Sequence, residues 1–309
     1  MSRLLSKFIG SYPRALWYTL CLKPNQTLTN DTYGYVLARV PIPSSPRVRF
    51  QGLVAVGSNI YGIKESSYFA KEEDSSSNVS ILDCHTHTWR EAPSLPVKLS
   101  SLSASVLDGN IYVAGRSYKD GESSLDSLRN TFEVFDTEAQ SWDAETIPWS
   151  ETKCSFYSSR SACINGKFHV KTSTEVVAYN SKEVRWDLVN REMSEYMKSD
   201  FYCVIENVLY SASYGGLIWY DTEVSMWKEL KGLVGLPEFS LGACVRLADY
   251  GGKMAVLWER DLFGYKNIWC AEITLERCGY KICGKVEWFG NVLTVPKSCS
   301  LMKVLAVAV

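Results

Sequence analysis

The chain has 309 residues, of which 46% are hydrophobic and 22% are charged, and its formal net charge is −1. This length and apolar content suffice for one large domain with a sizeable core. The balanced charge excludes a basic field that could hold a phosphate backbone, so we expect no nucleic-acid partner.

Two apolar segments near the N-terminus, residues 17–22 and 35–40, predict β-strands that have no complete repeat before them. Residues 4–9 fit a further strand before them only loosely. From about residue 50 onward, an apolar run, a tight turn and a second apolar run recur five times, with turns at residues 57–59, 108–110, 165–167, 206–207 and 250–253. These turns are rich in Gly, Asn and Asp, which tolerate the positive φ that β-hairpins need.

A second pattern follows four of these hairpins: an apolar residue, then Asp or Asn, and a Trp six residues after it. The pairs are Asp83 and Trp89, Asp136 and Trp142, Asn180 and Trp186, and Asp221 and Trp227; Trp288 ends a similar run after a longer insertion. We expect the Asp or Asn to hold the turn by bonding to nearby backbone, and the Trp to pack between adjacent sheets.

Each repeat therefore contains four short strands, and the spacings between these Trp residues lie between 41 and 61 residues. A period near 50 with four strands per unit is typical of a kelch-type β-propeller. We predict an all-β fold with five blades in residues 46–296. Residues 1–45 and a closing strand in residues 297–309, innermost in its sheet, complete a sixth blade, so the whole chain is one propeller domain.

Propellers bind partners through loops at the ends of their blades, and three long connections are predicted here, at residues 64–77, 115–130 and 260–267. Aromatic and Arg side chains on exposed loops dominate many interfaces. The candidates are Tyr68, Phe69, Arg116, Tyr118, Arg129, Arg260, Phe263 and Tyr265. The alternative for each is an ordinary solvated loop residue. We interpret the acidic serine run at residues 71–77 as a solvated loop rather than a phosphorylation site.

The sequence predicts no catalytic, cofactor or metal site. His85 and His87 would place two imidazoles on one side of a strand, but no third ligand accompanies them, and His169 fits a strand or core residue. Three His in all are too few for a copper site, and no phosphate-binding loop, nucleophile elbow or paired-carboxylate motif is present.

Location and redox state follow from the ends of the chain and its cysteines. No apolar segment of signal-peptide length follows Arg3 and Lys7, and residues 301–309 are too short to cross a bilayer, so no membrane partner is expected. The ten cysteines contain no Cys-x-x-Cys pair, and most lie in apolar, strand-like runs. We interpret them as reduced thiols of a cytoplasmic or nuclear protein.

Several segments resemble the plant F-box/kelch-repeat family over nearly the whole chain. They are residues 17–24, 80–93, 104–115, 230–237 and 247–258. The double glycine of the kelch motif is degenerate, appearing as Ala114-Gly115 in one repeat. Family members carry a helical F-box that grips a Skp-type adaptor and tethers a substrate to a cullin ubiquitin ligase. Here the sequence begins about where that module should end, so we expect it to be missing and the adaptor and cullin to be doubtful partners.

The resemblance implies a non-catalytic propeller that binds an unknown protein through one face, without a cofactor. One alternative is a ligase-associated substrate adaptor that acts through another subunit. The alternative from a different class is a propeller enzyme that acts on a small molecule or carbohydrate.

Overall fold

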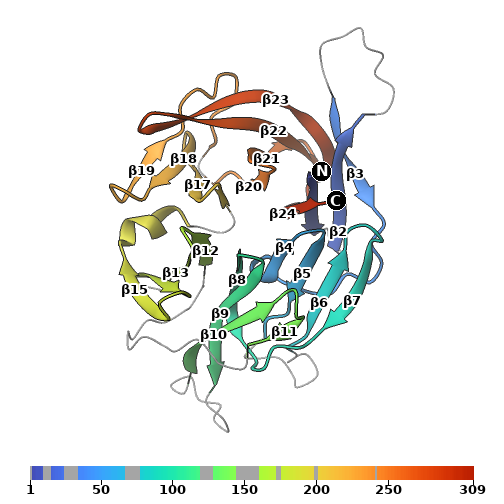
Figure 1. Ribbon diagram of the computed structural model, residues 1–309. Coiled ribbons are helices and arrows are strands. Elements are labelled where there is room, and N and C mark those ends of the chain that lie inside the picture. Colours follow the sequence, from blue (N-terminus) through green and yellow to red (C-terminus); the bar gives the residue numbers. More distant parts are fainter. Residues whose placement is uncertain are drawn as a thin grey trace. The chain divides into compact units, whose positions relative to one another are not determined.

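The structure is a computed structural model that describes residues 2–9, 15–23, 34–66, 77–118, 128–143, 160–171, 175–197, 201–240 and 242–309. Within these residues the chain forms six four-stranded antiparallel sheets and two short 3₁₀ helices, η1 (Phe50–Gly52) and η4 (Arg191–Tyr196) (Figure 1). The prediction of six four-stranded blades is confirmed. The sheets belong to two compact units, Pro46–Lys198 and Met1–Ser45 together with Ser199–Val309.

The unit Pro46–Lys198 holds three sheets, each built from strands that are consecutive in the chain. The first contains β4 (Leu53–Val56), β5 (Asn59–Ile63), β6 (Val79–Asp83) and β7 (Thr88–Ala92). The second contains β8 (Ser100–Leu107), β9 (Asn110–Tyr118), β10 (Leu128–Asp136) and β11 (Ser141–Trp142). The third contains β12 (Arg160–Ile164), β13 (Lys167–Lys171), β14 (Val176–Asn180) and β15 (Arg185–Val189).

The other unit also holds three sheets. Two are consecutive: β16 (Tyr202–Ile205), β17 (Val208–Ser213), β18 (Gly216–Asp221) and β19 (Met226–Glu229), then β20 (Val245–Tyr250), β21 (Lys253–Leu262), β22 (Tyr265–Cys278) and β23 (Lys281–Pro296). The third runs in the order β24 (Ser300–Ala308), β1 (Ser2–Ile9), β2 (Ala15–Leu22) and β3 (Tyr35–Val40).

The two chain ends meet in that last sheet, as the sequence predicted. Leu5 of β1 lies opposite Leu305 of β24 on one side and Thr19 of β2 on the other. The strand before Trp17, which the sequence indicated only loosely, is therefore a full member of the sheet. This pairing gives both edges of β1 a hydrogen-bonded neighbour, which removes an edge open to aggregation.

The predicted hairpin turns form where Gly, Asn and Asp stand. Four of them place both central residues at positive φ, as a type I′ turn requires: Asp108-Gly109, Asn165-Gly166, Glu206-Asn207 and Gly251-Gly252. The turn that begins at Gly57 has positive φ at that glycine alone. Local backbone chemistry thus sets the first hairpin of each of these sheets.

The turn before each repeated Trp is held by the residue that the sequence singled out. The side-chain Oδ1 accepts a hydrogen bond from the backbone N–H two residues later, at 2.7, 2.8, 3.1 and 2.9 Å, in Asp83, Asp136, Asn180 and Asp221. The fourth residue after each of them is left-handed, with φ between 51° and 56°: His87, Gln140, Val184 and Ser225. The expected backbone role of the Asp or Asn is confirmed.

The hydrophobic core of each unit lies between adjacent sheets, and repeated Trp residues such as Trp142 and Trp186 pack against it. The ring of Trp186 lies 4.4 Å from Phe132 of the preceding sheet and 5.2 Å from Tyr179 of its own. Trp288 lies on the fourth strand of its sheet, but opposite Glu272 and 4.7 Å from Tyr35. Like the other repeated Trp residues it belongs to the fourth strand of its sheet, but it lies in the middle of that strand and does not follow an Asp-held turn.

Candidate binding surface

Each sheet has one end at which its second and third strands are connected, and we call this the loop end. In the sheet β16–β19 this connection is Tyr214-Gly215, and in the sheet β20–β23 it is Phe263-Gly264. The structure describes five of the side chains predicted to bind a partner, and all five belong to connections or strand ends at loop ends: Arg116, Arg129, Arg260, Phe263 and Tyr265.

The prediction of a long loop at residues 260–267 is wrong. Arg260 belongs to β21 and Tyr265 opens β22, so only Phe263 and Gly264 connect the strands. The last four residues of β21 extend past the start of β20 at Val245, because Val245 pairs with Trp258. Polar residues on both faces of such a protruding hairpin resemble a loop in the sequence, which explains the error.

One face of this hairpin is anchored to the rest of its unit. Lys266 forms an ion pair of 2.8 Å with Glu259, and both side chains are largely buried. The second carboxylate oxygen of Glu259 accepts a hydrogen bond from the backbone N–H of Leu301 at 2.6 Å. The carbonyl of Gly264 accepts another from the N–H of Lys297 at 3.2 Å. These contacts fix the hairpin before any partner arrives.

The opposite face of the hairpin is open at its outer part. Deeper in this face, Trp258 is buried, stacks on Trp269 at 6.1 Å and meets the ring of Phe239 at 5.8 Å. Farther out, Leu262 and Tyr265 lie directly opposite each other and are 50% and 57% exposed. The covering side chains therefore stop before the end of the hairpin.

The turns at the loop ends of two consecutive sheets in this unit carry exposed aromatic rings. Phe263 is fully exposed and Tyr214 is 77% exposed. In each turn the left-handed residue is the following glycine, Gly264 with φ 76° and Gly215 with φ 90°. The turn geometry requires the glycine, whereas nothing in the backbone requires an aromatic residue before it.

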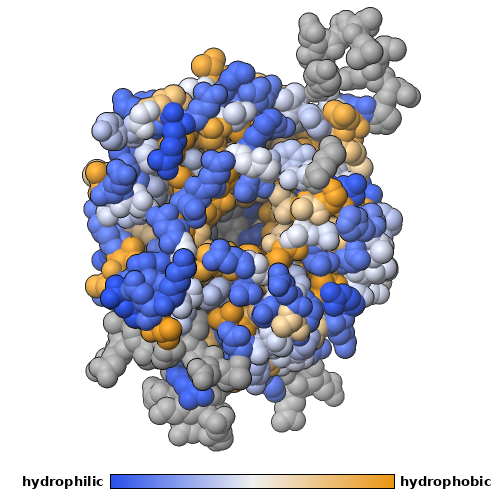
Figure 2. Space-filling model, viewed as in Figure 1, coloured by the Kyte–Doolittle hydropathy of each residue, from blue (hydrophilic) through white to orange (hydrophobic). Residues whose placement is uncertain are grey.

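We define the aromatic rim as Tyr214, Leu262, Phe263 and Tyr265. Figure 2 shows one face of the molecule, on which hydrophobic residues are scattered among a hydrophilic majority. The four residues of the aromatic rim are grouped because all are exposed and lie at the loop ends of two consecutive sheets of one unit. Phe263 and Tyr265 were predicted from the sequence. Tyr214 and Leu262 were not, because Tyr214 lies in a two-residue turn rather than a long connection and Leu262 is neither aromatic nor Arg.

The two candidate side chains that the structure describes in the other unit, Arg116 and Arg129, do not form one surface. Arg116 and Arg129 are strand residues rather than loop residues, a second correction to the prediction. Arg116 lies opposite Asn130, whereas Arg129 lies opposite Ser117, so the two arginines point to opposite faces of their sheet. The connection after β9 is shorter than predicted, since β9 runs to Tyr118 and β10 starts at Leu128.

The side chains at three other predicted positions lie outside what the structure describes. Tyr68 and Phe69, together with most of the acidic serine run, fall in residues 67–76. Tyr118 closes β9, and its side chain is outside the described atoms.

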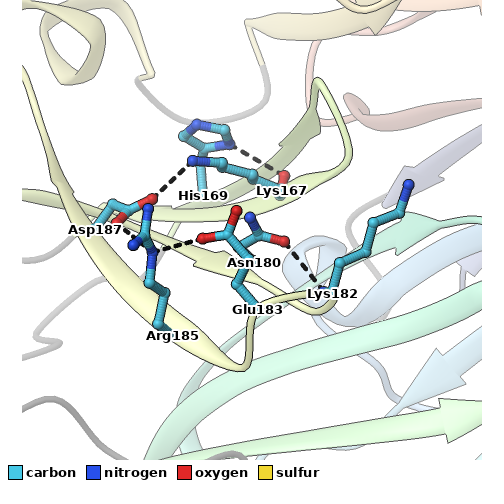
Figure 3. A network of polar contacts seen from close by, with 7 residues as sticks. All are labelled: Lys167, His169, Asn180, Lys182, Glu183, Arg185 and Asp187. Atoms are coloured by element: carbon cyan, nitrogen blue, oxygen red, sulfur yellow. Dashed lines mark hydrogen bonds and ion pairs between the residues drawn. The ribbon is translucent and has the colours of Figure 1, made fainter.

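A network of charged side chains lies at the end of the sheet β12–β15 opposite its loop end, where short turns connect β12 with β13 and β14 with β15 (Figure 3). Lys167 forms an ion pair of 2.7 Å with Asp187, and Arg185 lies 2.7 Å from Glu183 and 3.2 Å from Asp187. Lys167 and Arg185 thus each meet a carboxylate, whereas Lys182 joins the network through its backbone N–H, which donates to Asn180 Oδ1 at 3.1 Å. His169 sits in β13 as expected, and burial lowers the pKa of its imidazole to about 4, so it is neutral at pH 7.

Ligands for a metal do not converge in the described part of the chain. His85 and His87 lie in the turn between β6 and β7 rather than on a strand, and no group of three or more His, Cys, Asp or Glu residues there could hold a metal ion. The nine cysteines that the structure describes are free thiols. In the described residues, no helix is both long and apolar enough to cross a membrane.

One carboxyl group is buried without full hydrogen bonding. Glu133 on β10 is 1% exposed, and its Oε1 has no hydrogen-bond partner. Burial, with a smaller contribution from Asp143, raises its pKa to about 7. It lies inside the sheet packing rather than on the surface that carries the aromatic rim.

Comparison with known proteins agrees with this architecture. The family described as FKB95, Kelch-repeats domain matches residues 17–293. The F-box/kelch-repeat protein At5g51250 of Arabidopsis thaliana is 54% identical, over 96% of this chain and 82% of its own length. The F-box/kelch-repeat protein At3g06570 of the same organism is 48% identical over 97% of this chain and 79% of its own length.

A third relative from Arabidopsis thaliana, F-box/kelch-repeat protein At5g38670, is 46% identical over 92% of this chain and 97% of its own length. The six four-stranded sheets and these matches agree with the resemblance that the sequence suggested. The chain belongs to the plant F-box/kelch-repeat protein family, and its fold is a kelch-type β-propeller.

Proposed function

We propose that the chain is a non-catalytic protein-binding propeller that holds its partner at the aromatic rim. This proposal rests on the exposure of Phe263 and Tyr214, at turns whose geometry requires only the adjacent glycines, together with the exposure of Leu262 and Tyr265 on the strands that flank the Phe263 turn. Exposed aromatic side chains on rigid turns bury large apolar areas on binding and lose little conformational entropy. The anchored hairpin supports this proposal, since a fixed surface loses less entropy when a partner binds.

A finer proposal concerns the partner's fate. The relatives are named F-box/kelch-repeat proteins, which supports a partner that is a substrate of a ubiquitin ligase. In the stand-alone form of this proposal, the chain binds the partner without a Skp-type adaptor or a cullin. In the ligase-associated form, those subunits accompany it through another protein. We place either form in the cytoplasm or the nucleus, where reducing conditions maintain free thiols.

Quantitative affinity capture from plant cells tests the proposal. Three tagged chains are compared: the natural chain, a rim variant carrying Tyr214→Ser, Phe263→Ser and Tyr265→Ser, and a control carrying Tyr280→Ser. Tyr280 is 89% exposed in the turn between β22 and β23, at the opposite end of the same sheet.

We expect a specific partner that the rim variant loses and the control keeps. Equal recovery by all three chains would refute binding at the rim. Adaptor and cullin subunits among the captured proteins would favour the ligase-associated form, and their absence beside a retained partner would favour the stand-alone form.

A further inference from the structure

The open face of the β21–β22 hairpin carries a pair of polar side chains next to the aromatic rim. Arg260 and Asn267 lie directly opposite each other on neighbouring strands. Arg260 is exposed and has no ion pair or hydrogen bond in the described structure. Asn267 Oδ1 accepts a hydrogen bond from Thr294 Oγ1 at 2.8 Å, which leaves the amide N–H groups of its side chain available.

These two side chains therefore present mainly hydrogen-bond donors. A guanidinium group has five N–H donors and no acceptor, and the carbonyl oxygen of the Asn267 amide is already engaged. The group that complements such a pair is an acceptor-only anion, and a carboxylate is the one that proteins supply. Charge-assisted hydrogen bonds to a carboxylate are among the strongest in proteins.

An apolar pair stands next to the donor pair on the same face. Leu262 and Tyr265 oppose each other two residues farther along each strand, at roughly 6.6 to 6.8 Å in an extended backbone. An extended partner segment has the same spacing between alternate side chains. A carboxylate at one position and an apolar group two residues away would then meet both pairs at once.

The surroundings explain why this site is open and preformed. Trp258 and Trp269, deeper on the same face, are packed under Phe239, whereas the outer two pairs have no such cover. The other face of the hairpin is held by the largely buried ion pair of Lys266 and Glu259.

We propose that this face binds an extended segment of a partner protein in which an Asp or Glu lies two residues from a large apolar residue. This inference rests on the proposed function and specifies the chemistry of the partner. Arg260 and Asn267 bind the carboxylate, and Leu262 and Tyr265 bind the apolar side chain. Phe263 at the tip extends the apolar contact. A small free anion would use only the donor pair and leave the apolar pair exposed.

Selection from a library of random displayed peptides, with the full chain as bait, tests the inference. Synthetic peptides then measure affinity by fluorescence anisotropy: one with Asp-Gly-Leu in an extended Gly/Ser context, one with Asn in place of Asp, and one with Asp and Leu adjacent. The protein variants are Arg260→Gln, Tyr265→Ser and a control, Asp261→Asn. Asp261 is exposed on the opposite face of the same hairpin.

We expect enrichment of peptides with an acidic and an apolar residue two positions apart. The Asn peptide and the Arg260→Gln variant each weaken binding at least about fivefold, because a charge-assisted hydrogen bond is lost. The peptide with adjacent residues binds less well, and Asp261→Asn has no effect.

Enrichment without an acidic residue at this spacing, or equal binding by Arg260→Gln, would overturn the inference. A partner captured from cells that is lost with the rim variant but indifferent to Arg260→Gln would also overturn it while leaving the proposed function intact. Recovery of the partner by the rim variant would remove the proposed function itself.

Discussion

Val184 has a left-handed backbone conformation that is unfavourable for a β-branched side chain. It is the left-handed residue in the turn that Asn180 holds, with φ 51°. A β-branched residue at positive φ is an outlier, because its Cβ substituents crowd the neighbouring backbone. His87, Gln140 and Ser225 take the same place in the other three turns, and none of them is β-branched. We therefore predict that Val184→Asn stabilises the protein.

The size of the effect follows from exposure and conformation. The left-handed conformation costs an ordinary L-residue about 1–2 kcal/mol, whereas Asn tolerates it. Val184 is 58% exposed, so its replacement sacrifices little buried area. We expect a net gain of about 1 kcal/mol, which raises the melting temperature by about 1–2 °C in a protein of 309 residues.

Val224 provides a matched control for this test. It is 53% exposed in the Asp221 turn of another sheet, but it is not left-handed. Thermal unfolding followed by circular dichroism compares Val184→Asn and Val224→Asn with the natural chain. We predict stabilisation by the first substitution and none by the second. Equal shifts from both, or a loss of stability with Val184→Asn, would refute the conformational argument.

Three further predictions concern packing, a buried carboxyl and an ionised turn. Gly284→Ala would place a Cβ 2.6 Å from Leu233, so thermal unfolding should show a loss of about 1–3 kcal/mol in the free energy of unfolding. Gly216→Ala is the milder control, because nothing lies within 4 Å of its added Cβ. Burial raises the pKa of Glu133 to about 7 in the folded protein. The protonated carboxyl contributes to the free energy of unfolding at a pH below the pKa of the unfolded chain, and this contribution is lost as the pH rises through 7. Glu133→Gln should therefore raise the melting temperature at pH 8 but not at pH 4. Asp221 has a lowered pKa, chiefly through Lys228; its stabilisation should disappear as pH falls, and Asp221→Ala should reduce the melting temperature at pH 7 more than at pH 3.

Local chemistry explains which parts of the fold could be predicted. Asp83 and Asp221 bond to backbone N–H groups two residues away, so their role depends on a short stretch of sequence and was predicted correctly. Type I′ turns such as Asn165-Gly166 are equally local. The pairing of β1 with β24 followed from unpaired apolar segments at both chain ends. Its register, with Leu5 opposite Leu305, depends on packing in the assembled sheet.

Long-range geometry explains what was missed. Residues such as Arg260 and Tyr265 suggested a loop, because strands that protrude beyond their neighbours carry polar and aromatic residues on exposed faces. Tyr214 gave no signal, because it lies in a two-residue turn between β17 and β18 rather than in a long connection. Trp288 was grouped with the repeat, but bulges in the pairing of β22 with β23 shift its strand away from the regular pattern.

The most direct test of the account is oxidative footprinting of the captured complex, read residue by residue by mass spectrometry. Binding at the aromatic rim predicts that Tyr214, Phe263 and Tyr265 become protected when the partner is bound, whereas Tyr280 at the opposite end stays as reactive as in the free chain. Protection of Tyr280 with unchanged labelling of the rim residues would contradict the account and place the partner at the other end of the sheets.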